Sequence, residues 1–367
     1  MRIVVVGGGV IGTMHAWAAR RIGHEVIQLE ADAEPRRASV RNFGLVWVSG
    51  RAPGAELELA LRSRALWEEL GSAVRGIGFR PDGSLTVAQH PAELAVMEEL
   101  VAQADAARRG VHVLDADETR AQNPAVQGEI LGALFCARDA IVEPRQVLPA
   151  LRSHLESGGG YKFAPGRVAT RIAPGTVDDH TGAVHEGDVV VVCPGAMHDG
   201  VAADFLADAP VRRCRLQMMQ TEPFGEQLTT ALADGDSLRY YPAFDLPSSS
   251  ALPPPVPVVA EYRAQLLVAQ RASGELTIGD THHYDEPYDF AVDETPYAHL
   301  LARVESLLGR PVPPVERRWA GVYSQATDDS TCVRVRPDPG IVVVTGLGGR
   351  GMTLSPAVAE ATMEELA

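Results

Sequence analysis

The glycine motif that follows the first apolar run constrains the fold of this chain more than any other feature. Residues 2–6 are apolar and strand-like, and the sequence GGGVIG at residues 7–12 follows directly with the spacing G-x-G-x-x-G. Residues 10–22 have helical spacing, and residues 25–30 form a second strand-like run. In such a unit the glycines permit a tight turn, the approach of a pyrophosphate and close packing of helix on strand. The pattern predicts a Rossmann-type nucleotide-binding unit.

An acidic residue, Glu30, closes the second strand-like run. A carboxylate at this place accepts hydrogen bonds from the ribose hydroxyls of an adenosine. It would also repel a 2′-phosphate. We therefore expect Glu30 to bind the ribose of a dinucleotide that lacks this phosphate.

A second glycine-rich turn follows another buried strand much later in the chain. Residues 341–346 are apolar, residues 346–353 read GLGGRGMT, and a helix is expected from Ser355 to Leu366. Backbone N–H groups in this turn could face a flavin ring, and the positive end of the helix dipole would favour negative charge on the reduced flavin. The chain thus returns to the same sheet, which favours FAD over NAD.

Between these two units the periodicity predicts helices first and then a strand-rich block. Further helices are expected at residues 56–75, 91–109 and 144–155. Further strands are expected at residues 84–88, 140–143, 188–193, 213–222, 237–244, 260–270 and 274–280. Residues 246–257 are rich in proline and serine and should form an exposed or mobile loop.

This order predicts a mixed α/β and α+β architecture with two domains. A Rossmann-type, glutathione-reductase-like FAD-binding domain is expected to comprise residues 1–78, 140–208 and 318–367. An antiparallel-sheet substrate domain, formed by residues 79–139 and 209–317, interrupts it.

Composition excludes several classes of partner. A net charge of −15 disfavours nucleic acid and anionic membrane surfaces, and no run of about twenty apolar residues could span a membrane. The four cysteines form no C-x-x-C pair, so neither a zinc motif nor a thioredoxin-like motif is expected, and we predict no metal site. Glycines interrupt the first apolar run, and no small-residue cleavage site follows it, so a signal peptide is not expected. We predict reduced thiols and a cytoplasmic protein.

Taken together, these segments resemble the D-amino-acid oxidase superfamily of flavoproteins, which includes glycine oxidase and sarcosine oxidase. Beyond the glycine loop, the likeness includes ASVRNFG at residues 38–44, VEP at 142–144, CPGA at 193–196, WAG at 319–321 and the final glycine-rich segment. The resemblance implies that noncovalent FAD is the cofactor. Together with the motifs it assigns FAD to Gly7, Gly9, Val10, Ile11, Gly12, Glu30, Ala31, Ser39, Arg41, Asn42, Gly44, Val168, Gly195, Gly348, Gly349, Arg350, Gly351, Met352 and Thr353.

Within the superfamily, residues 41–44, Trp47 and the sequence GDTHHY at residues 279–284 resemble a subgroup associated with aminophosphonate breakdown. Glycine oxidases have arginines for the substrate carboxylate at positions that resemble Gly349 and the stretch Gly321-Val322-Tyr323 here. The usual carboxylate clamp is therefore missing or rebuilt, and glycine should be a poor substrate.

Two further departures concern the flavin. Thr277 resembles the position of a sarcosine oxidase lysine that helps oxygen react. Sarcosine oxidases also attach flavin through a cysteine soon after the region that resembles residues 319–325, whereas the next cysteine here is Cys332.

Candidate catalytic residues are those that could orient a substrate beside the flavin. They are Trp47, Tyr241, His282, Tyr323 and Arg350, with Tyr240, His283, Arg41 and Arg239 as further candidates. Strand alternation predicts that only one of Tyr240 and Tyr241, and only one of His282 and His283, faces the flavin. Arg350 is the first candidate for pairing with a substrate anion, because a guanidinium matches two oxygens of a carboxylate or phosphonate.

The leading functional hypothesis is an FAD-dependent oxidoreductase that oxidises the CH–NH bond of a small anionic amine by hydride transfer to flavin N5. The amine is primary or secondary, and an aminophosphonate fits the subgroup resemblance. Oxygen or an electron carrier would accept the electrons. One alternative is a 2-hydroxy acid oxidase or dehydrogenase with a histidine base, and another is a non-catalytic nucleotide-binding protein. The sequence leaves the oligomeric state open.

Overall fold

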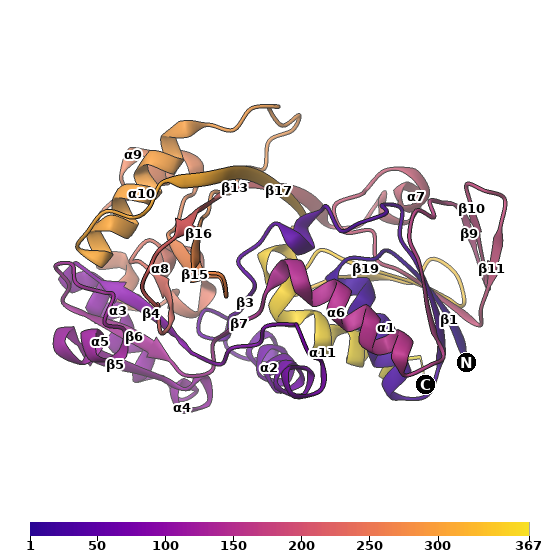
Figure 1. Ribbon diagram of the computed structural model, residues 1–367, viewed down its shortest axis with the longest axis horizontal. Helices are drawn as coiled ribbons and strands as arrows, with labels where there is room; N and C mark the ends of the chain where they lie inside the picture. Colours follow the sequence, from indigo (N-terminus) through magenta and orange to yellow (C-terminus); the bar gives the residue numbers. More distant parts are fainter. Residues whose placement is uncertain (367) are drawn as a thin grey trace.

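The computed structural model describes residues 1–366, and two large β-sheets lie at opposite ends of the molecule (Figure 1). The first sheet has six strands, and its neighbours pair in parallel except at one edge, where β18 runs antiparallel to β19. From edge to edge the strands are β18 (Val333–Val335), β19 (Ile341–Thr345), β12 (Val189–Val192), β1 (Arg2–Val6), β2 (Glu25–Leu29) and β8 (Tyr161–Ala164). The chain therefore does return to the same sheet, as the sequence predicts.

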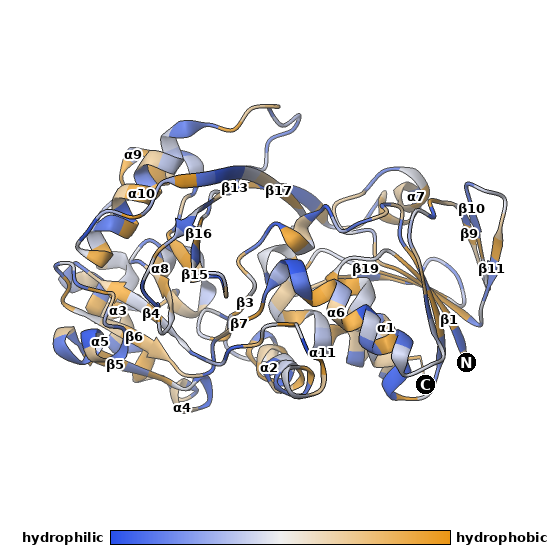
Figure 2. Ribbon diagram, viewed as in Figure 1, coloured by the Kyte–Doolittle hydropathy of each residue, from blue (hydrophilic) through white to orange (hydrophobic). Residues whose placement is uncertain are grey.

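The central strands of this sheet are continuous apolar runs because both of their faces are covered. Val5 and Val191 pack into the core on one face, whereas Val4 and Val343 belong to a separate cluster on the other. Burial of each such side chain contributes about 1.5–3 kcal/mol relative to exposure. In Figure 2 the strands near β1 and β19 are largely coloured as hydrophobic. This is the pattern expected of a parallel sheet.

Four helices lie on the side of this sheet that leads to the glycine motifs. They are α1 (Val10–Arg21), α2 (Ala55–Ala73), α6 (Pro144–Ser157) and α11 (Gly351–Glu364). Helices α1 and α6 lie against its strands, and α2 packs on α11. Helix α1 packs closely on α11 through small buried residues such as Ala16 and Ala359. This contact brings the first and last glycine motifs of the chain together.

The second sheet has eight strands and is antiparallel except where β14 pairs with β4. From edge to edge the strands are β17 (Val315–Ala326), β13 (Val211–Pro223), β16 (Glu275–Gly279), β15 (Leu267–Gln270), β14 (Ala231–Ala233), β4 (Ser84–Ala88), β6 (Gly132–Cys136) and β5 (Val111–Asp115). The long pair β13 and β17 extends from this sheet toward the six-stranded sheet (Figure 1).

The remaining elements are short or lie on the outside of the two sheets. The helices are α3 (Pro91–Val101), α4 (Ala106–Arg109), α5 (Ala116–Gln122), α7 (Ala203–Leu206), α8 (Ser237–Tyr240), α9 (Pro257–Tyr262) and α10 (Glu294–Leu308). Two small sheets pair β3 (Leu45–Val46) with β7 (Ala140–Ile141), and β10 (Thr176–Asp179) with β9 (Ala169–Ala173) and β11 (Val184–Glu186). Short 3₁₀ turns are η1 (Ala38–Val40), η2 (Gly200–Ala202), η3 (Pro242–Phe244), η4 (Pro247–Ala251) and η5 (Gly348–Arg350).

The predicted mixed architecture, a Rossmann-type unit combined with an antiparallel sheet, is confirmed. Both large sheets draw their strands from separate parts of the chain, and the division into two domains remains a prediction. Strand β17 begins at Val315, three residues before the proposed boundary at residue 318, and belongs to the eight-stranded sheet throughout.

Several predicted elements are wrong in detail. Residues 237–244 form α8 and η3 instead of the predicted strand, because Pro242 cannot donate to a strand ladder. Of the predicted strand 260–270 only β15 is a strand. The expected helix 91–109 is interrupted after Val101, although no proline or glycine breaks the sequence there. Helix α11 begins at Gly351, earlier than predicted, and the expected loop at 246–257 contains η4 and a buried Leu252.

A buried carboxylate connects the two parts of the fold. Asp139 accepts hydrogen bonds from the backbone N–H groups of Val48 and Ser49 and from the hydroxyls of Ser49 and Ser84. Ser84 begins β4 in the eight-stranded sheet, whereas Val48 follows β3. Asp139 thus holds the segment around Val48 and Ser49 in place, next to Trp47. Throughout residues 1–366, no helix combines the length and apolar character needed to cross a membrane.

Candidate active site

The glycine loop between β1 and α1 needs glycine for steric reasons. Gly7 has φ +114°, and a Cβ there would lie 2.3 Å from the carbonyl oxygen of Cys193. A Cβ on Gly12 would lie 2.1 Å from the carbonyl oxygen of Gly7. The loop therefore holds the N-terminus of α1 against the ends of β1 and β12, where free N–H groups and the helix dipole favour an anion.

Glu30 lies at the end of β2 and binds this loop directly. One carboxylate oxygen accepts a hydrogen bond from the backbone N–H of Gly8 (2.5 Å), and the other accepts one from Asp32 (2.9 Å). Arg152 from α6 donates to the carbonyl of Gly8. Each carboxylate oxygen has two lone pairs, so Glu30 can accept further hydrogen bonds from a ribose.

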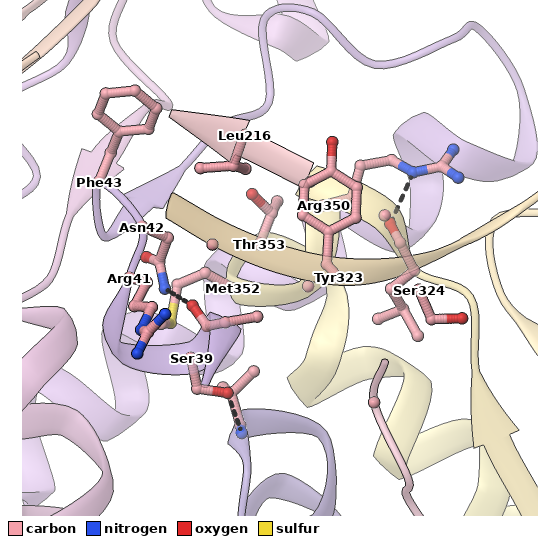
Figure 3. Close-up of a pocket in the computed structure, with 18 of the residues that line it drawn as sticks. Ser39, Arg41, Asn42, Phe43, Leu216, Tyr323, Ser324, Arg350, Met352 and Thr353 are labelled. Atoms are coloured by element: carbon pink, nitrogen blue, oxygen red, sulfur yellow. Dashed lines mark hydrogen bonds between the residues drawn. The ribbon is translucent and has the colours of Figure 1, made fainter. Parts of the chain in front are cut away.

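The segment that follows η1 forms a second wall beside α1. The Ser39 hydroxyl accepts a hydrogen bond from the backbone N–H of Val10 (2.9 Å), and the Asn42 side chain bonds the carbonyl of Ala38 and the N–H of Gly44. Gly44 has φ +73°, and a Cβ there would meet the carbonyl oxygen of Val142 at 2.1 Å. Figure 3 shows Ser39, Arg41 and Asn42 together on one side of the pocket.

The glycine-rich turn before α11 forms the opposite wall. The Thr353 hydroxyl accepts a hydrogen bond from the backbone N–H of Trp47 (2.9 Å), which joins this turn to the segment after β3. A Cβ on Gly351 would meet nothing within 4 Å, so the turn borders open space. Its backbone is therefore accessible from the pocket.

One extended pocket runs between these walls and continues into the space under β13 and β17. It contains about 1210 Å³ free of protein atoms, part of it open to solvent. One half is lined by the glycine motifs and the segment from Ala38 to Asn42. The other half is lined by aromatic, apolar and a few charged side chains, namely Phe43, Trp47, Arg51, Leu216, Met218, Tyr240, Tyr241, Gln265, Leu267, Asp280, His282 and Tyr323.

Two tyrosine hydroxyls converge on the glycine-rich turn. A Cβ on Gly349 would lie 3.6 Å from the hydroxyl oxygen of Tyr323 and 3.7 Å from that of Tyr240. The Tyr323 hydroxyl is buried and has no hydrogen-bond partner among the described residues. Burial raises the pKa of both phenols, so they are neutral hydrogen-bonding groups at ordinary pH.

Two arginines of the pocket share one buried carboxylate. Glu56 from α2 lies 3.4 Å from Nη1 of Arg51 and 3.3 Å from Nη1 of Arg350, measured to the same oxygen. Burial opposes ionisation of Glu56, but the two guanidinium groups hold its pKa below the usual value. Figure 3 shows the Arg350 guanidinium turned away from Arg41 and Asn42. Its Nε donates to the carbonyl of Leu347.

A buried acid and a buried amide lie at the aromatic end. Asp280 is 6% exposed and accepts a hydrogen bond from Nε2 of Gln265 (3.3 Å), while Oε1 of Gln265 has no partner among the described residues. His282 donates from Nδ1 to the carbonyl of Arg263 (2.9 Å), and its Nε2 lies 3.8 Å from the Asp280 carboxylate. Burial raises the pKa of Asp280.

The family model for FAD dependent oxidoreductases (DAO) matches residues 2–365. The chain belongs to this family. The predicted D-amino-acid oxidase superfamily, the class of enzyme and the FAD cofactor are thereby confirmed.

Individual relatives share only about a fifth to a quarter of their residues with this chain. A glycine oxidase from Bacillus licheniformis is 23% identical over 380 residues, which cover 97% of this chain and 90% of that protein. An opine oxidase subunit from Agrobacterium tumefaciens (strain Ach5) is 26% identical over 239 residues, which cover 60% of this chain and 63% of that protein. The match thus spans less than two thirds of the opine oxidase chain. The crystal structure of glycine oxidase from Bacillus cereus ATCC 14579 has the same fold, with a TM-score of 0.79, 19% identity and coverage of 100% and 94%.

The pocket of this FAD-dependent oxidoreductase fits the cofactor. One half of it is lined by the glycine motifs, and the positive ends of two helices open into it. Fourteen of the residues predicted to bind FAD line it: Gly9, Val10, Ile11, Gly12, Ser39, Arg41, Asn42, Gly195, Gly348, Gly349, Arg350, Gly351, Met352 and Thr353. These residues would hold the pyrophosphate and the flavin.

Five other residues assigned to FAD from the sequence do not line this pocket. Gly7 and Gly44 shape the backbone behind it, and Glu30 and Ala31 lie beyond the glycine loop at the end of β2. Val168 precedes β9 and is 43% exposed, and its backbone N–H and carbonyl both bond His180. A backbone contact from Val168 to adenine would have to replace these bonds.

All five predicted catalytic residues of the oxidoreductase, namely Trp47, Tyr241, His282, Tyr323 and Arg350, line the pocket. Strand alternation fails for Tyr240 and Tyr241, which both line it, because α8 ends between them and no strand is present. For the histidines only His282 lines it, and His283 is exposed. Arg239 instead reaches the carbonyl of Pro253 and does not line the pocket.

Sequence reasoning missed Arg51, Glu56, Gln265 and Asp280. Asp280 lies within the motif GDTHHY, and its place after a strand could have drawn attention to it. Arg51 offered one signal, a lone cation four residues after Trp47. Gln265 and Glu56 gave none, because the packing of distant elements brings Gln265 to Asp280 and Glu56 to Arg350.

The cysteines of the oxidoreductase are all free thiols in the described chain. Only Cys193 lines the pocket, and burial raises the pKa of its thiol. Cys332 lines a separate surface depression. Noncovalent attachment of FAD remains a prediction, and acid precipitation that left the flavin on the protein would contradict it.

Proposed function

We propose that this oxidoreductase oxidises the CH–NH bond of a small primary or secondary amine that also carries an anionic group, with an aminoalkylphosphonate as the first candidate. The observation that carries the proposal is the pair of buried acceptors at the aromatic end of the pocket. Asp280 and Gln265 both line the pocket, and the buried Oε1 of Gln265 has no hydrogen-bond partner among the described residues. When it binds in its protonated form, a secondary amine offers two N–H donors to such a pair and a primary amine offers three.

A buried acceptor without a donor costs roughly 1–3 kcal/mol of free energy. An amine that donates hydrogen bonds to these acceptors removes this cost, which favours its binding. A 2-hydroxy acid offers a single O–H donor and would leave one acceptor unpaired. It would also need a base, and His282 has Nδ1 bound to Arg263 and Nε2 directed at Asp280. The site therefore supports an amine better than a hydroxyl substrate.

FAD, when bound, supplies the oxidant that takes two electrons and a hydrogen from the substrate carbon. The protein supplies orientation and a largely water-free space. Trp47 and Tyr241 stack with ring centroids 6.1 Å apart, and Tyr240 stacks on His282 at 4.3 Å. These rings and the apolar side chains of Leu216 and Met218 enclose the substrate carbon, while Asp280 and Gln265 hold the nitrogen.

Gly349 and Tyr323 stand at the positions that resemble those of the glycine oxidase arginines. Their presence favours a substrate whose anionic group is not an α-carboxylate. Gly349 has no side chain, and Tyr323 contributes an unpartnered hydroxyl near it. A phosphonate has three oxygens to accept from such hydroxyls and from a guanidinium. The subgroup resemblance points to the same substrate class. We place the enzyme in the cytoplasm because its thiols are free.

The experiment is a comparison of amines by anaerobic reduction of the bound flavin. The panel comprises 2-aminoethylphosphonate, its N-methyl derivative, sarcosine, glycine and D-alanine. One of the two phosphonates should bleach the flavin fastest and glycine should be slow. Glycine or D-alanine at the top of the ranking would refute the phosphonate proposal but leave amine oxidation in place.

A further inference from the structure

The strongest unexplained feature of the pocket is the arrangement of two arginines around Glu56. Arg51 follows the segment that carries Trp47, Arg350 belongs to the glycine-rich turn, and Glu56 lies in the first turn of α2. A second carboxylate oxygen of Glu56 accepts a hydrogen bond from the backbone N–H of Ala52 (3.1 Å). Residues 51–56 and the glycine-rich turn near the end of the chain thus meet in one buried ionic cluster.

The cluster carries an excess of positive charge. Two guanidinium groups and one carboxylate leave a net charge of plus one, and both arginines line the pocket. Arg51 is 4% exposed, so little water is available to screen its charge. A buried positive charge without a full counter-charge in its own cluster favours the binding of an anion.

The hydrogen bonds show which arginine has a free edge. Arg350 uses Nε, Nη1 and Nη2, which contact Leu347, Glu56 and Ser330 respectively. Arg51 donates from Nε to the carbonyl of Trp47 (2.9 Å) and from Nη1 to Glu56 (3.4 Å). Within residues 1–366 no hydrogen bond occupies Nη2 of Arg51. This nitrogen has N–H groups to offer to a ligand.

Arg51 also lies close to an aromatic side chain of the pocket. Its guanidinium carbon lies 5.4 Å from the ring centre of Tyr241, and the charges of both Arg51 and Asp280 act on the Tyr241 hydroxyl. Arg51 and Asp280, which carry opposite charges, both line the pocket that Tyr241 also lines. A substrate with an amine and an anion at its two ends would find a partner for each charge in this pocket.

We propose that Arg51 binds the anionic group of the substrate, a carboxylate or phosphonate, and that Glu56 is the positioning residue that holds Arg51 and limits the charge of the site. The assignment of the anion to the substrate rests on the proposed amine oxidation, whereas anion binding itself does not. Arg51 thus replaces the missing glycine oxidase arginines from a different segment of the chain.

The test is equilibrium binding of methylphosphonate and of acetate to the oxidised holoprotein, measured by calorimetry and by the flavin absorbance without turnover. Arg51→Met should weaken binding of both anions roughly 10- to 100-fold, the loss expected for one charged hydrogen-bonding partner. Arg108→Met is the matched control, because Arg108 pairs with Glu58 at the protein surface. It should leave binding unchanged.

Glu56→Gln should change anion affinity in the direction opposite to Arg51→Met. Removal of the negative charge raises the net charge of the cluster, so the anions should bind several-fold more tightly. Glu58→Gln on the same helix is its control. If the substitutions only disrupted the pocket, both Arg51→Met and Glu56→Gln would weaken anion binding. The proposal requires weaker binding in Arg51→Met and tighter binding in Glu56→Gln.

Unchanged binding in Arg51→Met, or weaker binding in Glu56→Gln, would overturn the proposal. Arg51→Lys, which keeps the charge, should retain part of the affinity and shows that a loss in the methionine variant is not a failure to fold. Because no turnover is needed, these titrations stand even if the enzyme proves not to oxidise amines. Conversely, amine oxidation could hold while the anion titrations fail.

Discussion

The backbone N–H of Gly8 donates a 2.5 Å hydrogen bond to the carboxylate of Glu30. This contact joins the glycine loop to the end of β2, so the residue expected to bind the ribose also holds the loop that would bind the pyrophosphate. Glu30 therefore has a structural role in addition to the predicted one.

Glu30→Ala should weaken FAD binding and also destabilise the apoprotein. Loss of a charged hydrogen bond to the ribose corresponds to about 1.5–3 kcal/mol of binding free energy. Loss of the bonds from Gly8 and Asp32 should lower the melting temperature of the apoprotein as well. Glu25→Ala, at the exposed start of the same strand, is the control. Unchanged FAD affinity in a titration of apoprotein would remove Glu30 from the site.

Tyr323→Phe should reduce activity without loss of stability. The Tyr323 hydroxyl is buried and unpartnered, so its removal leaves no other group unsatisfied. If it contacts the substrate, kcat/KM should fall about tenfold or more. Tyr161→Phe is the converse case, because the Tyr161 hydroxyl donates to Gln28 (2.6 Å) away from the pocket. That variant should lose roughly 1–2 kcal/mol of stability with normal kinetics. Equal effects of both variants on kcat/KM would contradict the assignment.

Asp280→Asn should lower activity but stabilise the fold at alkaline pH. Burial raises the pKa of Asp280, so the folded protein keeps this proton to higher pH than the unfolded chain. Stability then falls as pH rises from the ordinary carboxyl range near about 3.9 through the raised pKa. The asparagine variant should avoid this loss and unfold at higher denaturant concentration at pH 8 than the wild type.

The pH dependence of wild-type activity should report the same ionisation of Asp280. If the carboxylate holds the amine, kcat/KM should rise through the raised pKa of Asp280, and this acid limb should vanish in Asp280→Asn. Asp285→Asn, in the exposed loop nearby, is the control. An unaltered acid limb would exclude Asp280 from this role.

Reduced enzyme should react slowly with oxygen. Thr277 is buried within β16 and does not line the pocket, so no cation replaces the sarcosine oxidase lysine there. Arg350 lines the pocket and is the first alternative, but Glu56 offsets its charge, and a weaker positive field stabilises less of the negative charge that develops on oxygen. Stopped-flow reoxidation measures this rate. Fast reoxidation that persists in Arg350→Met would show that neither residue controls it.

The parts of the fold that local sequence determines were predictable. The glycine loop, β1 and α1 follow from glycine spacing and hydrophobic periodicity, which act within a few residues. The turn at Gly351 was predictable for the same reason, although α11 begins earlier than its apolar pattern indicates. Residues 237–244 were not predictable, because a short aromatic run fits a strand and a buried turn equally well.

The substrate half of the site depends on contacts that no local pattern encodes. Glu56 reaches Arg350 across 294 positions of the chain, and Gln265 meets Asp280 through tertiary packing. Conversely, Arg350 has the expected place, but its guanidinium is already committed to Glu56. Position along the chain predicts which backbone lines the pocket, whereas side-chain pairing decides which charges remain for a ligand.

The most direct test of amine oxidation is anaerobic stopped-flow reduction of the flavin by two substrates that differ only in the reacting group. 2-Aminoethylphosphonate and 2-hydroxyethylphosphonate share the same chain and anion, so the anion subsite cannot distinguish them. We predict reduction by the amine and little or none by the alcohol, because Asp280 and Gln265 together require more than one donor. Faster reduction by 2-hydroxyethylphosphonate would contradict the proposed function.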